Sequence, residues 1–276
     1  MKVLVVVVIH NGMKWLERCL GSVKGADVFA VDSASTDGSA DFVEANFPAV
    51  HLVRKKENIG FGAGNNLGLK YAIDGGYDYV YLLNQDAWLE EDTLEKLVAA
   101  AEENKDYGIL SPVQRAASGE PDRLFAKRWK GREGLQDVKF IMAAHWLIRR
   151  TCILKTGGFA PLFPHNGEDD NYCDRARFHG YKIGILGSAS AVHDRADRPE
   201  NKESRLRRST LTGAVATLCN PSYPLWLLWI YVVLFAFWKS LKHWTLLPLK
   251  HLGKVFPLNN EIKHTRKESV LYGAFL

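Results

Sequence analysis

An aspartate at position 86 directly follows the run Tyr81-Leu82-Leu83, which has the apolar character of a buried strand. A carboxylate just beyond such a strand stands at the edge of a sheet, where it can bind a hard divalent cation against a diphosphate. The alternative is that Asp86 caps the turn or helix that begins near Ala87. Taken alone, the residue fits both interpretations equally well.

Polar residues also follow three other apolar runs in the first hundred residues. They are amides, carboxylates, glycines and a histidine: His10-Asn11, Asp32-Ser33, Asn58, Gly60 and Asn65. In an open α/β sheet the carboxyl ends of the strands meet at one edge and bind ligands there. Four strand ends with such side chains therefore predict one binding crevice.

The elements that must position these residues alternate regularly. Apolar, β-branched runs predict strands, and stretches with a helical pattern separate them. The expected strands are 3–9, 28–32, 50–54 and 77–83, and the expected helices are 13–23, 38–46, 63–73 and 91–103. Strands that are apolar on both faces and joined by helices predict an α/β fold, with a mostly parallel central sheet and helices on both faces.

Beyond residue 109 the pattern is less regular. Residues 116–134 are polar and contain three glycines and a proline, so we expect a mobile loop there. A longer apolar segment follows at 138–148. A helix is expected from about Asp169 to His179, and a strand over 181–186.

The composition changes near residue 200. From Asn201 onward the chain has 11 basic and 3 acidic residues, whereas the preceding part has 25 basic and 28 acidic ones. We therefore predict a catalytic or binding domain over 1–200 and a helical, apolar and basic extension over 201–276. The basic charge favours a polyanionic partner surface. Long aliphatic stretches interrupt the basic residues, which disfavours nucleic acid and leaves an anionic membrane.

The extension contains a strongly apolar segment at 225–238. As a helix its 14 residues would be about 21 Å long, which is short of the roughly 20 residues needed to span a bilayer. Nearby tryptophans and flanking lysines predict a segment that lies at the surface of an anionic membrane. We accordingly expect a cytoplasmic protein on the inner face of the cell membrane. The alternative is a buried helix, packed on the first domain or in a homodimer interface.

Three segments together resemble the inverting family 2 glycosyltransferases with the GT-A fold, including their rhamnosyltransferase-like members. They are 31–38 (VDSASTDG), 57–66 (ENIGFGAGNN) and 82–86 (LLNQD). Shorter matches follow in the right order: Arg149-Arg150, Gly157-Gly158-Phe159, Gly167-Glu168-Asp169, Arg175-Ala176-Arg177 and Gly180-Tyr181-Lys182. The resemblance covers roughly residues 1 to 195 and implies a Rossmann-like GT-A domain.

The resemblance also implies roles for the polar strand ends. Residues His10 and Asn11 match the first nucleotide-contacting loop, and Asp32 the carboxylate that contacts the base or ribose. The segment with Asn58, Gly60 and Asn65 belongs to the same donor site. In Asn84-Gln85-Asp86, Asp86 takes the place of the metal ligand for Mn2+ or Mg2+, and Asn84, where the family has Asp, becomes a ribose or phosphate contact. His193 matches a further metal ligand. The alternative is a surface histidine beside a mobile stretch of acidic and basic residues.

Asp169 matches the family's catalytic base. A single displacement needs a carboxylate beside the acceptor hydroxyl, opposite the leaving nucleotide. The competing explanation is that Glu168 and Asp169 simply favour a helix N-terminus. A second departure from the family is Asn171, which stands where an Asp is frequent.

The implied activity is inverting transfer of a hexosyl or deoxyhexosyl group from a nucleoside diphosphate sugar to a hydroxyl of a glycan or lipid-linked acceptor, in cell-surface polysaccharide or glycolipid synthesis. A sugar nucleotidyltransferase would need a glycine- and lysine/arginine-rich loop after the first strand, which residues 10–14 match poorly. A non-catalytic sugar-nucleotide-binding protein or membrane scaffold is supported only by Asn84 and Asn171. The spacing G-x-G-x-x-x-G from Gly62 to Gly68, after the third strand, disfavours a nicotinamide-dependent oxidoreductase.

Overall fold

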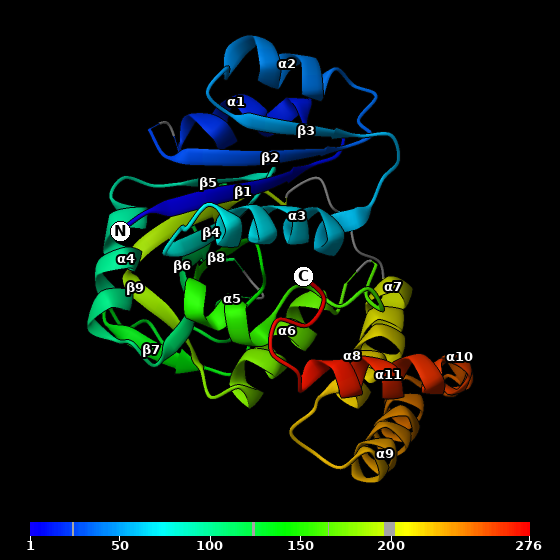
Figure 1. Cartoon of the computed structure of the whole chain (residues 1–276). Helices are drawn as coiled ribbons and strands as arrows, with labels where there is room; N and C mark the ends of the chain where they lie inside the picture. Colours follow the sequence, from blue (N-terminus) through cyan, green and yellow to red (C-terminus); the bar gives the residue numbers. More distant parts are fainter. Residues whose placement is uncertain (24, 123–124, 165, 196–201) are drawn as a thin grey trace.

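The computed structural model describes residues 1–23, 25–122, 125–164, 166–195 and 202–276 (Figure 1). The predicted domain boundary between residues 200 and 201 lies outside the described residues. So do residues 123 and 124 of the predicted loop.

A mixed sheet forms the centre of the described residues before residue 195. The parallel part has the order β3-β2-β1-β4, with β1 (Val3–Ile9), β2 (Asp27–Ser33), β3 (His51–Lys55) and β4 (Tyr79–Asn84). The sheet continues with β8 (His145–Arg149), antiparallel to β4, then β6 (Tyr107–Arg115) and β9 (Lys182–His193). Two short strands, β5 (Ala87–Leu89) and β7 (Leu135–Val138), pair with opposite ends of β9. The predicted mostly parallel sheet is thus extended on one side by a mixed part, in which β6 and β9 run parallel to β4 whereas β8, β5 and β7 run antiparallel to it.

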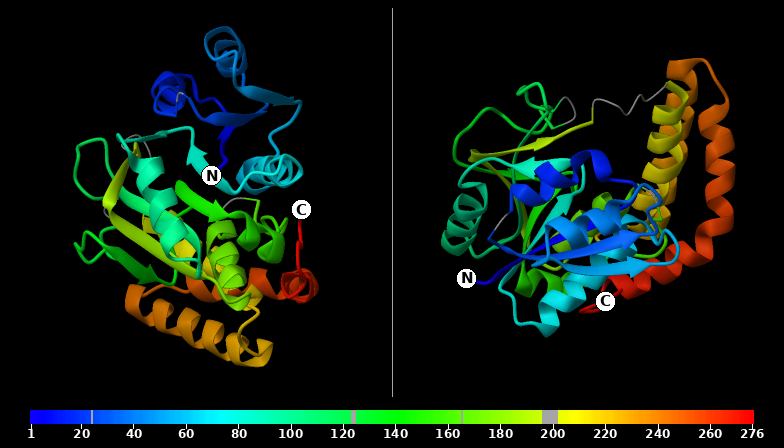
Figure 2. Two further views of the ribbon diagram at one scale, coloured as in Figure 1. Left: turned by 60° about the vertical axis from the view of Figure 1, so that its left-hand side comes forward. Right: turned by 90° about the horizontal axis from the view of Figure 1, so that it is seen from above.

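Helices cover both faces of this sheet, as predicted (Figures 1 and 2). One face carries α1 (Met13–Gly21), α2 (Ser39–Asn46) and α4 (Thr93–Glu103), and the other carries α3 (Gly60–Asp74), α5 (Arg150–Thr156) and α6 (Glu168–Phe178). Side chains of β1 alternate between the two cores: Leu4 and Val6 join one, whereas Val5 and Val7 join the other. The continuous apolar run of β1 is therefore explained by burial on both sides.

Two predicted segments differ from the structure. The apolar segment 138–148 is divided into the end of β7 and the start of β8, with irregular chain between them. The strand expected over 181–186 continues to His193, through an irregularity in its pairing with β6 between Leu186 and Ser190. This bulge carries β9 far enough to deliver His193 to the end of the sheet.

The C-terminal region is helical, as predicted. It consists of α7 (Lys202–Arg207), a π-helical turn η1 (Arg208–Thr212), α8 (Gly213–Cys219), α9 (Leu225–His243), α10 (Leu247–Val255), a 3₁₀ turn η2 (Phe256–Leu258) and α11 (Asn259–Ser269). These helices pack beside α6, and α9 lies on the outside (Figures 1 and 2).

The apolar helix α9 is longer than the 14 residues predicted. It has 19 residues, or about 28 Å, and it is the one helix of the described residues that is long and apolar enough to cross a membrane. The charge of Lys239 does not end it, because a cation near a helix C-terminus is stabilised by the helix dipole. In addition, the ammonium group of Lys242 lies 4.9 Å from the ring centre of Trp238.

The last residues of the chain return to the first domain. The N–H of Gly158 donates to the carbonyl of Ala274 (2.8 Å), and the Asn66 side chain in α3 donates to the carbonyl of Phe275 (3.1 Å). The fully buried Arg175 of α6 lies against the Phe275 ring and donates to the carbonyls of Thr156 and Gly158. The turn after α5, the helix α6 and the C-terminal segment therefore form one packed unit.

Gly157→Ala tests this packing. Gly157 has φ +81°, and an added Cβ would lie 1.8 Å from the carbonyl oxygen of Ala274. We expect the substitution to lower the free energy of unfolding by more than the roughly 1–3 kcal/mol that a sparsely populated positive-φ conformation costs a non-glycine residue, measured by denaturant titration. Gly180→Ala is the matched control, because Gly180 has φ +89° and open space around its Cβ position. Equal losses in the two variants would contradict the docking of the C-terminal segment.

Candidate active site

The register of the parallel strands brings two predicted site residues to either side of β1. Asp32 in β2 is opposite Ile9, and Asn84 in β4 is opposite the preceding residue, Val8. Asp32 is buried, and its Oδ2 accepts from the N–H of Ser35 (3.1 Å). Asp32 Oδ1 and Asn84 Oδ1 are both buried, and neither has a hydrogen-bond partner in the part of the chain that the structure describes. Two buried acceptors without donors at one sheet edge suit a ligand that supplies hydroxyl or N–H groups.

The loops after β1 and β4 are locked together by a residue that the sequence reasoning did not single out. The N–H of His10 donates to Gln85 Oε1 (2.8 Å), and Gln85 Nε2 donates to the carbonyl of His10 (3.0 Å). His10 also donates through Nδ1 to the carbonyl of Ser33 (2.8 Å), which ties in the loop after β2. Gln85 thus fixes the loop that also carries its neighbours Asn84 and Asp86.

The remaining predicted donor-site residues lie in the adjoining loops. The Asn11 side-chain oxygen accepts from the N–H of Thr36 (2.8 Å), and Asn58 Oδ1 accepts from Ser33 Oγ (3.1 Å) and from the N–H of Gly60 (2.9 Å). These contacts join the ends of β1, β2 and β3. Asn65 is different: it is buried in α3 and donates to the carbonyl of Phe61 in its own helix (2.9 Å).

The predicted metal ligands lie next to each other. His193 Nε2 is 3.4 Å from Asp86 Oδ1, and both side chains are almost fully buried. The pairing of β5 with β9 places them there, because Ala87 is opposite His193. Neither ring nitrogen of His193 has a hydrogen bond within the described residues.

A buried histidine of β8, His145, supports this pair. His145 Nε2 is 3.1 Å from the carbonyl of Val192, which can only accept, so Nε2 carries the proton and Nδ1 accepts from the Tyr81 hydroxyl (3.0 Å). Burial lowers the pKa of His145 to about 3, so its ring is neutral at physiological pH. The ring meets that of His193 edge to face. His145 therefore packs against the Asp86–His193 pair through the ring of His193.

The predicted base, Asp169, reaches the same edge through the chain that leads into β8. Its carboxylate is hydrogen-bonded by the backbone of Ala143, and the carbonyl of the next residue, Ala144, accepts from the N–H of Asn84 (3.1 Å). Two consecutive residues thus connect the base with the strand end that carries Asn84. The short irregular segment before β8 is the element that joins the two halves of the site.

Burial raises the pKa values of the acidic residues at the start of α6. The pKa of Asp169 lies above its usual range, although hydrogen bonds from the backbone and the charge of Arg128 oppose the shift. Burial and the neighbouring charge of Asp169 raise the pKa of Glu168 to about 7. A carboxylate with a raised pKa is a stronger base, which suits proton transfer near neutral pH.

The departure at position 171 has a structural explanation. Asn171 is buried, and its side-chain oxygen accepts from Arg175 Nε (3.0 Å) one helical turn further along α6. An amide there supports the buried guanidinium. Its replacement of an Asp is accordingly no sign of a lost active site.

Comparisons with known proteins address the family and the fold of this chain. The model of the family described as "Glycosyl transferase family 2" matches residues 4–153, more than half of the chain. An N-acetylglucosaminyl-diphospho-decaprenol L-rhamnosyltransferase of Mycobacterium tuberculosis is 23% identical over 232 residues, which are 70% of this chain and 76% of that protein. An undecaprenyl-phosphate mannosyltransferase of Micrococcus luteus is 29% identical over 107 residues, 36% of this chain and 44% of that protein. The chain spans less than half the length of several curated relatives that it matches.

A solved structure shares the fold over nearly the whole chain. The mannosyltransferase PcManGT from Pyrobaculum calidifontis, in complex with GDP-Man and Mn2+, superposes with a TM-score of 0.60 at 19% identity, covering 97% of this chain and 84% of that one. This likeness confirms the expected GT-A fold, together with the C-terminal helices. Since the family model covers more than half of its residues, the chain belongs to glycosyl transferase family 2.

Proposed function

We propose that this chain transfers a sugar from a nucleoside diphosphate sugar to a hydroxyl of a lipid-linked or glycan acceptor, with inversion at the anomeric carbon, in the synthesis of a cell-surface polysaccharide or glycolipid. The observation that carries the proposal is the convergence at one sheet edge of unpaired buried acceptors (Asp32 and Asn84), the Asp86–His193 pair and the carboxylate of Asp169. Several relatives are named as sugar transferases, two of them with polyprenyl-linked acceptors in their names, and they support the proposal.

The residues divide the reaction between them. Asp32 and Asn84 bind the hydroxyl or N–H groups of the nucleotide. Asp169 holds the acceptor hydroxyl and takes its proton as the oxygen attacks the anomeric carbon. The bond from that carbon to the diphosphate oxygen breaks on the opposite face, and its electron pair leaves with the nucleoside diphosphate. One new glycosidic bond and one protonated Asp169 result, so the charges balance.

The Asp86–His193 pair fits a divalent cation such as Mn2+ or Mg2+. A carboxylate oxygen and an imidazole nitrogen are both suitable donors, and the His193 nitrogens are not engaged elsewhere in the described part of the chain. No third His, Cys, Asp or Glu among the described residues completes a group around them. Phosphate oxygens of the donor and water would then supply the other ligands of the cation. When bound, the cation neutralises the diphosphate and makes it a better leaving group.

The outer face of α9 supports a location at the membrane. Its inner face, which includes Leu228, Val232 and Ala236, packs on the neighbouring helices. Lys239 and Lys242 lie near the end of the helix. The outer face exposes large apolar side chains, namely Trp226, Leu227, Ile230, Val233, Leu234, Phe237, Trp238 and Leu241. A contiguous group of exposed large apolar side chains on a soluble protein marks an interaction site. With aromatic and basic residues together, the occupant we propose is an anionic bilayer on the cytoplasmic side, with α9 lying at its surface.

Asp169→Asn should reduce sugar transfer by about 10²- to 10⁴-fold, because it removes the base, while UDP or GDP binding is retained.

In the parent protein, protonation of Asp169 abolishes its role. Its pKa is raised, so transfer falls as the pH is lowered, beginning nearer neutrality than for an ordinary aspartate. The measurement is kcat/KM between about pH 5 and 9. Asp106→Asn, at an exposed carboxylate paired with Lys182, is the control. Absence of transfer in the parent protein would favour the scaffold alternative.

Asp86→Asn should weaken Mn2+ binding in the presence of UDP or GDP. We expect a loss of at least about 10- to 100-fold, the cost of changing even outer-shell partners of metal ligands. The electron paramagnetic resonance signal of free Mn2+ reports this binding independently of activity. Asp74→Asn, at an exposed carboxylate paired with Lys70, provides the comparison. Unchanged Mn2+ affinity in Asp86→Asn would remove this residue from the metal site.

The triple variant Trp226→Ser, Leu234→Ser, Phe237→Ser should lose binding to vesicles that contain phosphatidylglycerol. Each of these side chains is more than half exposed, and burying it in lipid is worth about 1–3 kcal/mol, so a loss well beyond tenfold is expected in co-sedimentation. Leu154→Ser, an exposed apolar residue on α5, should have no effect. If light scattering instead shows a dimer that the triple variant dissociates, the face is a subunit interface.

A further inference from the structure

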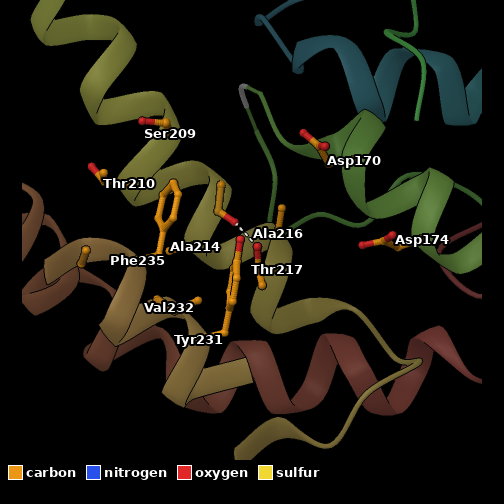
Figure 3. A pocket seen from close by; sticks show the side chains of 12 residues that line it. Asp170, Asp174, Ser209, Thr210, Ala214, Ala216, Thr217, Tyr231, Val232 and Phe235 are labelled. Carbon is orange, nitrogen blue, oxygen red and sulfur yellow. Dashed lines mark hydrogen bonds between the residues drawn. The ribbon is translucent and has the colours of Figure 1, made fainter. Parts of the chain in front are cut away.

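A cavity of about 210 Å³ lies between α6 and the C-terminal helices (Figure 3). None of the residues assigned above to the donor site or the metal site is part of its lining. Carboxylates, hydroxyls and aromatic rings line it from four elements: Asp170 and Asp174 of α6, Ser209 of η1, Thr217 of α8, and Tyr231 and Phe235 of α9.

The polar groups of the cavity mainly offer hydrogen-bond acceptors. The Ser209 hydroxyl donates to the carbonyl of Leu206 (3.0 Å), and the Thr217 hydroxyl donates to the carbonyl of Gly213 (2.7 Å). Their protons are therefore committed, and their free lone pairs are what a ligand meets. Burial raises the pKa of Asp174 to about 6, so its carboxylate is still mostly ionised at neutral pH. Burial and the neighbouring charge of Asp169 raise the pKa of Asp170 to about 7, so about half of this carboxyl group is ionised there. A ligand that fits must bring several donors of its own.

One wall of the cavity is aromatic. The rings of Tyr231 and Phe235 stack with their centroids 6.0 Å apart and their planes inclined by 16°, and both rise from α9 into the cavity (Figure 3). A sugar ring has a rim of hydroxyl donors and an apolar face of C–H groups, which matches acceptors on one side and aromatic rings on the other. The cavity is smaller than the roughly 300–1,000 Å³ of pockets for drug-sized ligands. It is therefore suited to a single ring.

The cavity is adjacent to the proposed base. Asp170 follows Asp169 directly, and its N–H donates to Asp169 Oδ1 (2.9 Å). Consecutive residues of a helix point about 100° apart, so the cavity and the base lie on neighbouring sides of the first turn of α6. The other border of the cavity is α9, whose outer face is the proposed membrane contact. A ligand in the cavity would lie between the membrane surface and Asp169.

From this placement we infer that the cavity binds a sugar unit of the acceptor and directs its hydroxyl toward Asp169. The inference rests on the proposed function, because it assigns an acceptor subsite to that reaction. All the lining residues fall within 170–236, whereas the family model ends at residue 153. The choice of acceptor is then made by the C-terminal helices, outside the segment that the family model matches.

The test uses the full chain and, as probes, the methyl glycosides of common hexoses, 6-deoxyhexoses and N-acetylhexosamines. Saturation-transfer NMR should show at least one glycoside bound to the parent protein. Tyr231→Ala, which removes the exposed aromatic wall, and Thr217→Leu, which fills the cavity, should each weaken this binding by about tenfold or more, or roughly 1.4 kcal/mol. Tyr223→Ala is the matched control, since Tyr223 is half exposed but lies outside the cavity.

UDP and GDP binding with Mn2+, measured on the same samples, should be equal in the parent protein and the three variants, which also shows that they are folded. Absence of binding for every glycoside, or binding that survives both cavity variants, would overturn the inference. If the parent protein binds a glycoside but neither UDP nor GDP, the proposed function is overturned, and the cavity remains a sugar site.

Discussion

The parallel pairing of β1 with β2 on one side and β4 on the other is the constraint on which the site depends. Residues Leu4 to Val7 of β1 are at most 1% exposed and contribute to the cores on both faces. This double burial fixes the register, because a slip of one residue would exchange the two apolar sets between the faces of the sheet. The same register sets Asp32 and Asn84 opposite neighbouring residues of β1. The packing of the core thus determines the spacing of the polar groups at its edge.

Polar contacts then convert this coarse placement into a defined site. The two hydrogen bonds between Gln85 and His10 join the loops at the ends of β1 and β4, and the neutral His145 supports the Asp86–His193 pair from below. Both supports are fully engaged by the protein itself. The buried polar atoms without a hydrogen bond in the described residues include Asp32 Oδ1 and Asn84 Oδ1, at the ends of β2 and β4. The side chains that hold the site in place, Gln85 and His145, are therefore hydrogen-bonded, whereas Asp32 and Asn84 each keep one buried oxygen without a hydrogen bond in the described residues.

Much of this was predictable from the sequence, for reasons of local pattern. The run 3–9 gave the bounds of β1 because a buried parallel strand is apolar throughout, and the polar strand ends identified the sheet edge. Contacts between distant residues were not predictable. Nothing local to Ala143 and Ala144 indicates that their backbone joins Asp169 to Asn84, and nothing in Arg175 names Phe275 as its neighbour. The expected apolar segment ends before Lys239, but α9 continues to His243. Lysines in the last turns of a helix do not end it, because the helix dipole stabilises them there. The cavity beside α6 arises only when helices far apart in sequence pack together.

The contact between Asn66 and Phe275 spans 209 residues of chain. During synthesis at roughly 5–20 residues per second, the interval between the emergence of these two residues is about 10–40 s. Through this interval the parallel strands β1 to β4 can pair, but the turn at Gly157 and Gly158 lacks its covering segment. The packed unit around α6 is thus completed after the parallel sheet, and a nascent chain holds the paired strands β1 to β4 well before it holds α6 with its covering segment. Chains shortened to end before Gly273 would then be expected to keep the parallel sheet but to lack the cover over Gly157 and Gly158.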